Sequence, residues 1–325
     1  MSTMTKPPLI ILTGPTGVGK TELSLRLAKK INGEIISADS IQVYRHFDIG
    51  SAKITKEEMQ GVKHYLIDIL NPDEEFNVYL FKQYAVAAVN EIYARNRIPI
   101  IVGGTGFYIQ SILYDIDFST EETKDRTIRE KYEEIAKIHG VDYLHNLLRE
   151  IDPDSADHIH KNNIKRVIRA LEYYEHTGER ISVHNERESK KNSPYNFVYF
   201  VLNRDREVLY DRIDKRVDKM LADGLIGEVK NLLDMGYSRN LVSMQGLGYK
   251  EIAAYLDGEC TVEEAVELVK RETRHFAKRQ LTWFRREKDV TFVDYEKYGN
   301  NIDVVGDALL QTILSKGIAG RNEET

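Results

Sequence analysis

The sequence GPTGVGKT, near the start of the chain, has the residue types and spacing of a phosphate-binding loop. An apolar run precedes it and a segment with helical apolar spacing follows it, which is the strand, loop and helix order that such a loop requires. In that order, backbone N–H groups and the positive end of a helix converge on an anion. Lys20 adds a positive charge, and Thr21 offers a hydroxyl to a divalent metal ion. The residues expected to bind phosphate are Gly14, Pro15, Thr16, Gly17, Val18, Gly19, Lys20 and Thr21.

The loop alone does not identify the phosphate compound, so the acids near the other expected strands matter. An NTPase usually has an apolar strand that ends in an acid, which helps to hold the metal ion. The most apolar expected strand, 99–102, ends in GGTG without a carboxylate, and Asp68 is interpreted as an edge or pairing residue of the strand expected at 65–70. Asp39 directly follows the strand expected at 34–38. It could serve as the base for an acceptor hydroxyl, so a small-molecule kinase stays open at this point.

The order of apolar patterns along the chain predicts the fold class. Apolar runs alternate with helical patterns over the first hundred residues, which indicates a parallel sheet with helical crossovers. From 120 to about 176 the pattern is charged amphipathic helix without an expected strand. We predict an α/β fold with a P-loop NTPase-like parallel sheet core and an inserted all-helical domain. The predicted bounds are 1–115 and 195–298 for the core, 116–194 for the insert, and 299–325 for a C-terminal helix, near 303–314, with a disordered tail; the remaining strands are expected at 9–12, 197–202 and 290–293.

The cysteine content and the lack of targeting signals indicate the cellular compartment. Cys260 is the only cysteine, so no intrachain disulfide can form, which suits a reducing compartment. The chain begins without the apolar core of a signal peptide, and no apolar stretch approaches membrane-spanning length. We therefore expect a cytoplasmic protein that has no membrane partner.

The positive charge of the chain is concentrated in two segments, although the net charge is −6. One segment, KRETRHFAKRQLTWFRREK at 270–288, is mostly basic, and the other contains Lys161, Lys165, Arg166 and Arg169. Two local basic faces on an acidic protein indicate a polyanion bound at chosen places. Each cluster taken alone fits a solvated helix face equally well.

Five motifs occur in a fixed order from Gly14 to Arg286: GPTGVGKT, SADSIQVYRHFDIGSAK, GGTGFYIQ, GLGYKEI and TRHFAKRQLTWFRR. In this order they resemble the tRNA dimethylallyltransferase family, also called tRNA isopentenyltransferases. The resemblance implies transfer of a dimethylallyl group from dimethylallyl diphosphate to the N6 amine of the adenosine 3′-adjacent to the anticodon, with release of diphosphate. Ser51 is a small departure, because the family more often has Thr before Ala-Lys.

The resemblance also implies roles for residues of the site. The loop would hold the diphosphate of the prenyl donor rather than the tail of ATP, with Mg²⁺ at Thr21. Lys20, Thr21 and Arg216 would stabilise the charge that develops on the leaving diphosphate. Asp39 matches the family's general base, which takes the proton of the amine. Arg212 lies four residues before Arg216, and for Arg212 ion pairs with neighbouring aspartates are an equal alternative.

A base-modifying enzyme must flip its target out of the stack, so the anticodon stem-loop of tRNA is the expected partner. The resemblance assigns tRNA contacts to three groups of residues. These are Asp39, Ser40, Ile41, Gln42 and Thr105 near the phosphate loop; Arg129, Asn163, Ile164, Lys165, Arg166 and Val167 in the insert; and Gln245, Gly246, Gly248, Tyr249, Arg274 and Arg279 in the core.

Two other functions remain open from the sequence. An adenylate isopentenyltransferase would use related chemistry, but it has no use for two basic clusters and a large helical insert. A P-loop kinase of a small molecule would use ATP. We expect a monomer, because RNA would have to wrap between the core and the insert.

Overall fold

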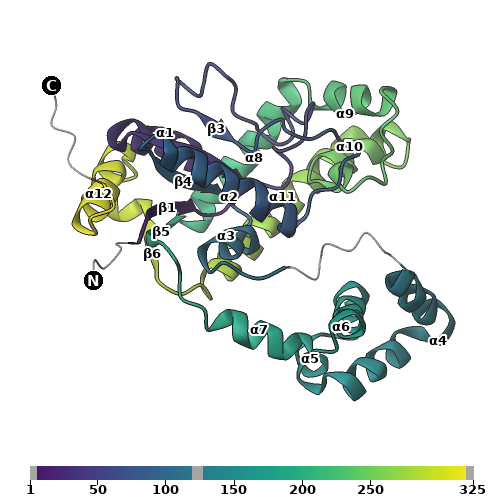
Figure 1. Ribbon diagram of the computed structural model, residues 1–325. Coiled ribbons are helices and arrows are strands. Elements are labelled where there is room, and N and C mark those ends of the chain that lie inside the picture. Colours follow the sequence, from purple (N-terminus) through teal and green to yellow (C-terminus); the bar gives the residue numbers. More distant parts are fainter. Residues whose placement is uncertain (1–5, 119–126, 320–325) are drawn as a thin grey trace, which may run out of the picture. The chain divides into compact units, whose positions relative to one another are not determined.

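The computed structural model describes residues 6–118 and 127–319 of the chain, which are drawn as ribbon in Figure 1. They divide into two compact units. The core contains the described residues up to Ile112 and those from Tyr195 onward, and the helical unit contains the described residues from Leu113 to Pro194. Each unit has its own cluster of buried apolar side chains. The tail expected at 320–325 lies outside the described residues.

A six-stranded sheet forms the centre of the core, with strand order β3-β2-β4-β1-β5-β6. All of its paired strands run parallel. The predicted α/β class with a parallel sheet is therefore confirmed. The strands are β1 (Pro8–Thr13), β2 (Gly33–Ala38), β3 (His64–Tyr65), β4 (Ile98–Gly103), β5 (Asn196–Asn203) and β6 (Val290–Asp294).

Helices follow most of the strands along the chain, as is usual for parallel pairing, and the exception is the connection from β2 to β3, which has no described helix. The C-terminal helix expected at 303–314 is present as α12, with one further residue at each end. The helical elements of the core are α1 (Lys20–Ile31), α2 (Val78–Ala94), α3 (Gly106–Leu113), α8 (Arg206–Ala222), α9 (Leu225–Asp234), the 3-10 turn η2 (Ser243–Gln245), α10 (Tyr249–Leu256), α11 (Val262–Phe284), the 3-10 turn η3 (Tyr295–Tyr298) and α12 (Ile302–Ser315).

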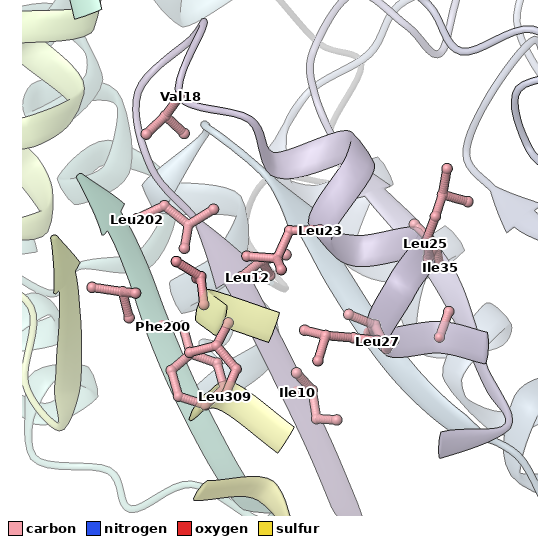
Figure 2. Close-up of a cluster of buried hydrophobic side chains, with 14 of the residues drawn as sticks. Ile10, Leu12, Val18, Leu23, Leu25, Leu27, Ile35, Phe200, Leu202 and Leu309 are labelled. Carbon is pink, nitrogen blue, oxygen red and sulfur yellow. The ribbon is translucent and has the colours of Figure 1, made fainter. Parts of the chain in front are cut away.

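Both faces of the central strands are buried. Ile10 and Leu12 of β1 pack with Leu23 of α1 and Leu309 of α12 on one face, as Figure 2 shows. Ile11, which points to the opposite face, is also fully buried, and α2 packs against β2 and β4. Parallel strands that are covered on both faces have nearly continuous apolar sequences. This explains why β1 is visible in the sequence, and it fixes the carboxyl ends of the strands as one edge.

The prediction of a strand at 65–70 was wrong, except at Tyr65. β3 contains only His64 and Tyr65, because Leu66 and Asp68 have φ angles of 63° and 55°. Such left-handed backbone cannot continue a strand. The Asp68 carboxylate instead accepts a hydrogen bond from Lys53 Nζ at 2.6 Å, so Asp68 is a pairing residue in a loop.

The helical unit packs around a small apolar cluster that includes Leu144, Leu148, Val167 and Leu171. Asp152 is buried and accepts hydrogen bonds from the backbone at both Ser155 and Ser182, which holds the starts of two helices together. None of the described helices of either unit has the length and apolar character needed to cross a membrane. The helices of this unit are α4 (Thr127–Ile151), α5 (Pro153–His158), α6 (Ile164–Thr177) and α7 (Ile181–Ser189).

Candidate active site

The phosphate loop joins β1 to α1 at the carboxyl edge of the sheet. Three of its glycines have positive φ: 146° at Gly14, 78° at Gly17 and 109° at Gly19. A β-carbon at Gly14 would lie 2.5 Å from the carbonyl oxygen of Leu202 in β5, so only glycine fits there. The loop thus turns tightly against the sheet and leads directly into the positive end of α1.

Lys20 folds back over its own loop. Its Nζ donates hydrogen bonds to the carbonyl oxygens of Gly14 and Pro15, each at 2.9 Å. Burial lowers the pKa of Lys20 to about 7, with a further decrease from the positive charge of Arg216 and an opposing effect from Asp39. The Lys20 side chain therefore lies within the electrostatic reach of both a cation and a carboxylate, and an anionic ligand at the loop would interact with it strongly.

Arg212 and Arg216, both on α8, have different roles around the loop. Arg212 Nε donates to the carbonyl oxygen of Gly17 at 2.8 Å, so Arg212 is bound to the phosphate loop. The alternative that Arg212 pairs with a neighbouring aspartate was wrong, because those aspartates pair with other cations. Asp211 accepts from Lys215, Asp214 from Arg274, and Asp218 pairs with Lys270.

Arg216 is half-buried and makes no hydrogen bond or ion pair with any residue that the structure describes. Burial lowers the pKa of this guanidinium, while the negative charge of Asp39 raises it and Arg212 lowers it. A half-buried cation without a paired acid is poised to bind an anion. Arg216 therefore lies within the electrostatic reach of Asp39, Arg212 and Lys20.

Asp39 directly follows β2, at the same edge of the sheet as the phosphate loop. Its Oδ1 accepts hydrogen bonds from the backbone N–H groups of Ile41 at 2.8 Å and Gln42 at 3.2 Å. Its Oδ2 accepts no hydrogen bond from residues 6–118 or 127–319. One oxygen therefore fixes the turn, and the other is available to accept a proton from a ligand.

The other predicted contacts near the loop divide into exposed and structural residues. Ser40 is exposed and Ile41 is half-buried. Gln42 uses its amide within the protein, because Nε2 donates to Ser51 O at 3.3 Å and Oε1 accepts from Ser37 at 3.1 Å. Thr105 directly precedes α3, and its N–H donates to Ala38 O at 3.4 Å, which places it next to the end of β2.

A network that the sequence did not reveal holds the DIGSAK segment after this turn. Glu228 of α9 accepts hydrogen bonds from the backbone N–H groups of Asp48, Ile49 and Gly50 at 3.0, 2.7 and 3.0 Å. The Tyr249 hydroxyl donates to Glu228 at 2.7 Å and accepts from Ser51 N at 3.1 Å. Glu228 lies far from these residues in the sequence and belongs to no motif, so only the fold identifies it.

Some of the residues around GLGYKEI that were predicted to contact tRNA are buried in the core. The Tyr249 side chain is only 1% exposed, and its ring packs on Phe47 with centroids 4.5 Å apart. Gly248 is buried and begins α10 with a φ of 90°. Gln245 is exposed, and its amide donates to Arg239 O at 2.7 Å, while the neighbouring Gly246 is half-buried. Tyr249 therefore positions the DIGSAK segment, and the exposed surface here is at Gln245.

Some of the basic residues predicted to contact tRNA form ion pairs with acids of the protein, and others do not. Arg274 donates two hydrogen bonds to Asp214 at 2.6 and 2.8 Å, and Arg129 pairs with Glu172 at 2.7 Å. Arg279 is exposed and lies over the Phe276 ring. Within the two basic segments, the exposed cations whose side chains make no ion pair with a described residue are Lys278, Arg279, Arg285, Arg286 and Lys288 in the core and Lys165 and Arg166 at the start of α6.

The remaining predicted contacts of the helical unit lie around the start of α6. Asn163 precedes its first residue, Ile164, and is exposed. Val167 is fully buried in the apolar cluster of the unit. Its side chain therefore supports the helix, and Lys165 and Arg166 carry the exposed charge of this segment.

A cavity of about 580 Å³ lies away from these residues. It is lined by the first half of β5, from Asn196 to Tyr199, together with Thr291, Thr312 and Lys316. The phosphate loop meets the opposite end of β5, near Leu202. The cavity is thus not the phosphate site.

The metal expected at Thr21 would have few ligands from the protein. Thr21 is exposed at the start of α1. Among residues 6–118 and 127–319, no group of three or more His, Cys, Asp or Glu side chains could hold a metal ion. This donor set fits Mg²⁺ held by one hydroxyl, by phosphate oxygens and by water, which is how Mg²⁺ is commonly bound.

Comparisons with known proteins agree with the motifs. The family model described as IPP transferase matches residues 42–287. The tRNA dimethylallyltransferase of Lachnoclostridium phytofermentans is 61% identical over 298 residues, which is 92% of this chain and 95% of that protein. The tRNA dimethylallyltransferase of Acetivibrio thermocellus is 51% identical over 298 residues, covering 91% of this chain and 95% of that protein.

Solved structures share the fold over nearly the whole chain. The full-length tRNA isopentenylpyrophosphate transferase from Bacillus halodurans has a TM-score of 0.70 and 44% identity, covering 96% of this chain and 98% of that chain. A eukaryotic dimethylallyltransferase described as acting on tRNA has a TM-score of 0.81 and 29% identity, covering 98% of this chain and 81% of that chain.

Proposed function

This chain belongs to the IPP transferase family, and on that premise we propose that it transfers a dimethylallyl group from dimethylallyl diphosphate to tRNA. The acceptor is the N6 amine of the adenosine 3′-adjacent to the anticodon, and diphosphate is released. The names of the curated relatives support a tRNA prenyltransferase. The motifs support the choice of donor and adenosine.

The observation that carries the proposal is the grouping of Asp39, Lys20 and Arg216 beside the phosphate loop. A diphosphate needs cations and backbone N–H groups, and an amine that is being alkylated needs a proton acceptor. The free Oδ2 of Asp39 meets the second need. β4 ends in glycines rather than in an acid, so the acid that an NTPase usually has at such a strand end is absent from this strand.

The residues of the site suit a dissociative transfer. As the C–O bond of the donor breaks, negative charge grows on the leaving diphosphate, where Lys20, Arg216 and the N–H groups of the loop stabilise it. The bond between N6 and the allylic carbon forms, and Asp39 takes the proton that the amine loses. An aryl amine is a weak nucleophile, so its orientation by the carboxylate matters as much as the proton transfer.

We include Mg²⁺ in the proposal. Thr21 would hold it through its hydroxyl, together with oxygens of the diphosphate. When bound, the ion neutralises charge on the leaving group. The absence of a carboxylate cage among the described residues is compatible with this arrangement, since the diphosphate supplies most of the negative ligands.

The anticodon stem-loop is the proposed RNA partner. The unpaired cations Lys278, Arg285 and Arg286 in the core and Lys165 and Arg166 in the helical unit supply charge for phosphate contacts. The family names support RNA as the acceptor, and tRNA modification would occur in the cytoplasm. We propose that a single chain suffices, because one copy contains every residue to which a role in the reaction is assigned.

Radiolabelled dimethylallyl diphosphate tests the function directly. The protein is incubated with the labelled donor and Mg²⁺, with either an unmodified tRNA transcript or AMP as acceptor, and the products are separated. We expect label in N6-prenylated adenosine from the tRNA, with none in AMP. Transfer to AMP alone would identify an adenylate prenyltransferase. A protein that leaves both acceptors unlabelled but converts ATP to ADP would be a kinase.

A further inference from the structure

Gln280 bridges the two loops that hold the two substrates of the proposed reaction. It lies on α11 and is only 6% exposed. Its Oε1 accepts a hydrogen bond from the N–H of Thr16 in the phosphate loop at 2.9 Å. Its Nε2 donates to the carbonyl oxygen of Gly104 at 3.1 Å, in the loop that precedes Thr105. This orientation of the amide gives each end of the side chain the partner it needs.

The Gln280 amide lies in very close contact with the backbone at Gly104. A β-carbon at Gly104 would lie 2.0 Å from Gln280 Nε2, so residue 104 must be glycine for the amide to enter. The strands below the loops are already joined, because Thr13 Oγ1 donates to Gly103 O at 2.6 Å. Gln280 extends this connection from the strands to the loops, where the proposed substrates bind.

The same helix meets the Gly104 loop a second time. Trp283, which is three residues after Gln280, lies so close to Gly106 that a β-carbon there would be 2.1 Å from its Nε1. Residues three apart lie on one face of a helix. The side of α11 that carries Gln280 and Trp283 thus packs on both loops, and Lys278 and Arg279 remain exposed.

The bridge also determines which N–H groups of the phosphate loop can bind the diphosphate, because Gln280 already accepts from one of them. The N–H of Thr16 is bound by Gln280 and the N–H of Val18 donates to Pro15 O at 3.4 Å, so the diphosphate has the other N–H groups of the loop, among them those at the start of α1. Gln280 thus adds a side-chain link between a bound donor and the loop of Gly104 and Thr105, beyond the pairing of the strands. In the proposed reaction, that relation sets the distance from the allylic carbon to the adenine.

We propose that Gln280 is a positioning residue that fixes the donor loop relative to the acceptor loop during prenyl transfer; this inference rests on the proposed function. Reacting atoms must approach to about 3–3.5 Å with the right alignment, and a misplacement of about 1 Å can slow a reaction about 10²-fold. The rate of the chemical step therefore depends on Gln280. The affinity for each substrate alone depends on other residues.

The test compares single-turnover transfer with the binding of each substrate alone. Gln280→Leu keeps a similar volume and removes both hydrogen bonds. We expect the rate at saturating substrates to fall about 10–10²-fold. The dissociation constants for inorganic diphosphate and for an anticodon stem-loop RNA should each stay within about threefold of wild type, because their cations and remaining N–H groups are intact.

Two more variants separate positioning from folding. Gln280→Glu still accepts from Thr16 but, when ionised, cannot donate to Gly104, so we expect a similar rate loss in a variant that keeps a polar side chain. Thr273→Val on the same helix removes a hydrogen bond from Thr273 Oγ1 to Val269 O and reaches neither loop, so it should transfer at the wild-type rate.

The outcomes are distinct. Wild-type rates at saturating substrates in both Gln280 variants would overturn the inference, even if their affinity for diphosphate fell, because Gln280 would then act in binding alone. A rate loss in Thr273→Val equal to that in Gln280→Leu would point to a general weakening of α11 and would also overturn it. If the wild-type protein itself transfers no label to tRNA, the proposed function fails instead.

Discussion

Lys20 and Arg216 lie close enough beside the phosphate loop for their positive charges to repel each other. Burial first, and then repulsion by Arg216, lower the pKa of Lys20 to about 7, whereas Asp39 opposes the decrease. A diphosphate would bring negative charge to both cations and favour the protonated lysine. Binding of the donor should therefore be linked to the uptake of a proton.

This linkage predicts the pH dependence of donor binding. Below about pH 7 the free protein already carries a charged Lys20, so the affinity should be greatest there. Above that pH, binding must protonate the lysine, and the dissociation constant should rise by up to about tenfold per pH unit. Calorimetry with dimethylallyl diphosphate from pH 6 to 9, in buffers of different ionisation enthalpy, measures both the affinity and the proton uptake.

Lys20→Arg is the matched control, because an arginine stays protonated over this range. Its donor affinity should lack the steep decrease above pH 7, whatever its absolute value. An equal pH slope in wild type and Lys20→Arg would assign the effect to the ligand rather than to Lys20.

Substitution of Asp39 should stop transfer and leave RNA binding largely intact. Asp39→Ala removes both the turn contacts and the proposed base, whereas Asp39→Asn keeps an oxygen that can accept from Ile41 N and Gln42 N. Loss of a general base lowers a rate by about 10²–10⁴-fold. We expect single-turnover transfer to fall by this factor in both variants, with stem-loop affinity within a few-fold. Near-normal transfer by Asp39→Asn would restrict Asp39 to a role in the turn.

Transfer should need Mg²⁺ and consume no ATP. β4 ends in Gly103, and Asp68 is bound to Lys53 in a loop, so neither supplies the acid that an NTPase usually places at a strand end. Product formation and nucleotide hydrolysis are measured together, with excess chelator in a parallel reaction. ADP formed in proportion to prenylated RNA, or full activity in chelator, would contradict this prediction.

Tyr249→Phe should destabilise the protein, because the buried Tyr249 hydroxyl is part of the hydrogen-bond network around Glu228. Its hydroxyl donates to Glu228 and accepts from Ser51 N, and its removal leaves Ser51 N without that partner. An unsatisfied buried donor costs about 1–3 kcal/mol. The free energy of unfolding, measured by urea denaturation, should fall by this amount. Tyr84→Phe on α2, where the side chain is more exposed, should have little effect; equal losses in both variants would exclude the Glu228 network as the cause.

The features that could be predicted best from the sequence are those formed by residues adjacent in the chain. GPTGVGKT and its flanks locate the phosphate loop because loop and helix geometry are local. Asp39 could be placed because parallel strands share one carboxyl edge. The short β3 could not be predicted, since no obvious turn sequence marks the left-handed backbone at Leu66, and the residues after it bond to a distant segment through Asp68 N to Gln42 O and Ile69 N to Val43 O. The bridge from Gln280 to Thr16 joins positions from opposite ends of the chain, and no local pattern marks it.

The same limit applies to the cations. The sequence treats Arg274 and Lys278 alike, as members of one basic helix. The structure pairs Arg274 with Asp214 of α8 and leaves Lys278 without an ion pair among the described residues. Availability for RNA thus depends on a partner that is distant in the sequence.

Lys165 and Arg166 provide a test of RNA binding that is separate from the donor site. Both are exposed at the start of α6 in the helical unit and make no ion pair within the described ranges. Lys165→Ala with Arg166→Ala should weaken stem-loop binding without changing the affinity for dimethylallyl diphosphate. Lys161→Ala is the matched control from the same segment, because Lys161 already pairs with Asp142 at 2.6 Å. We expect the control to bind RNA nearly as wild type does.

Salt dependence distinguishes phosphate contacts from a structural role for these two residues. Each lysine or arginine that neutralises a phosphate releases counterions from the RNA, so its replacement by alanine should reduce the slope of log affinity against log salt. With the duplex DNA value as a guide, the slope should decrease by about 0.9 for each phosphate that is no longer neutralised. Filter binding of the stem-loop over a range of salt concentrations gives the slope for each variant. Weaker binding at an unchanged slope would indicate that the pair shapes α6. Unchanged binding would make the pair a solvated face, and the RNA-binding residues of the helical unit would have to be found elsewhere on it.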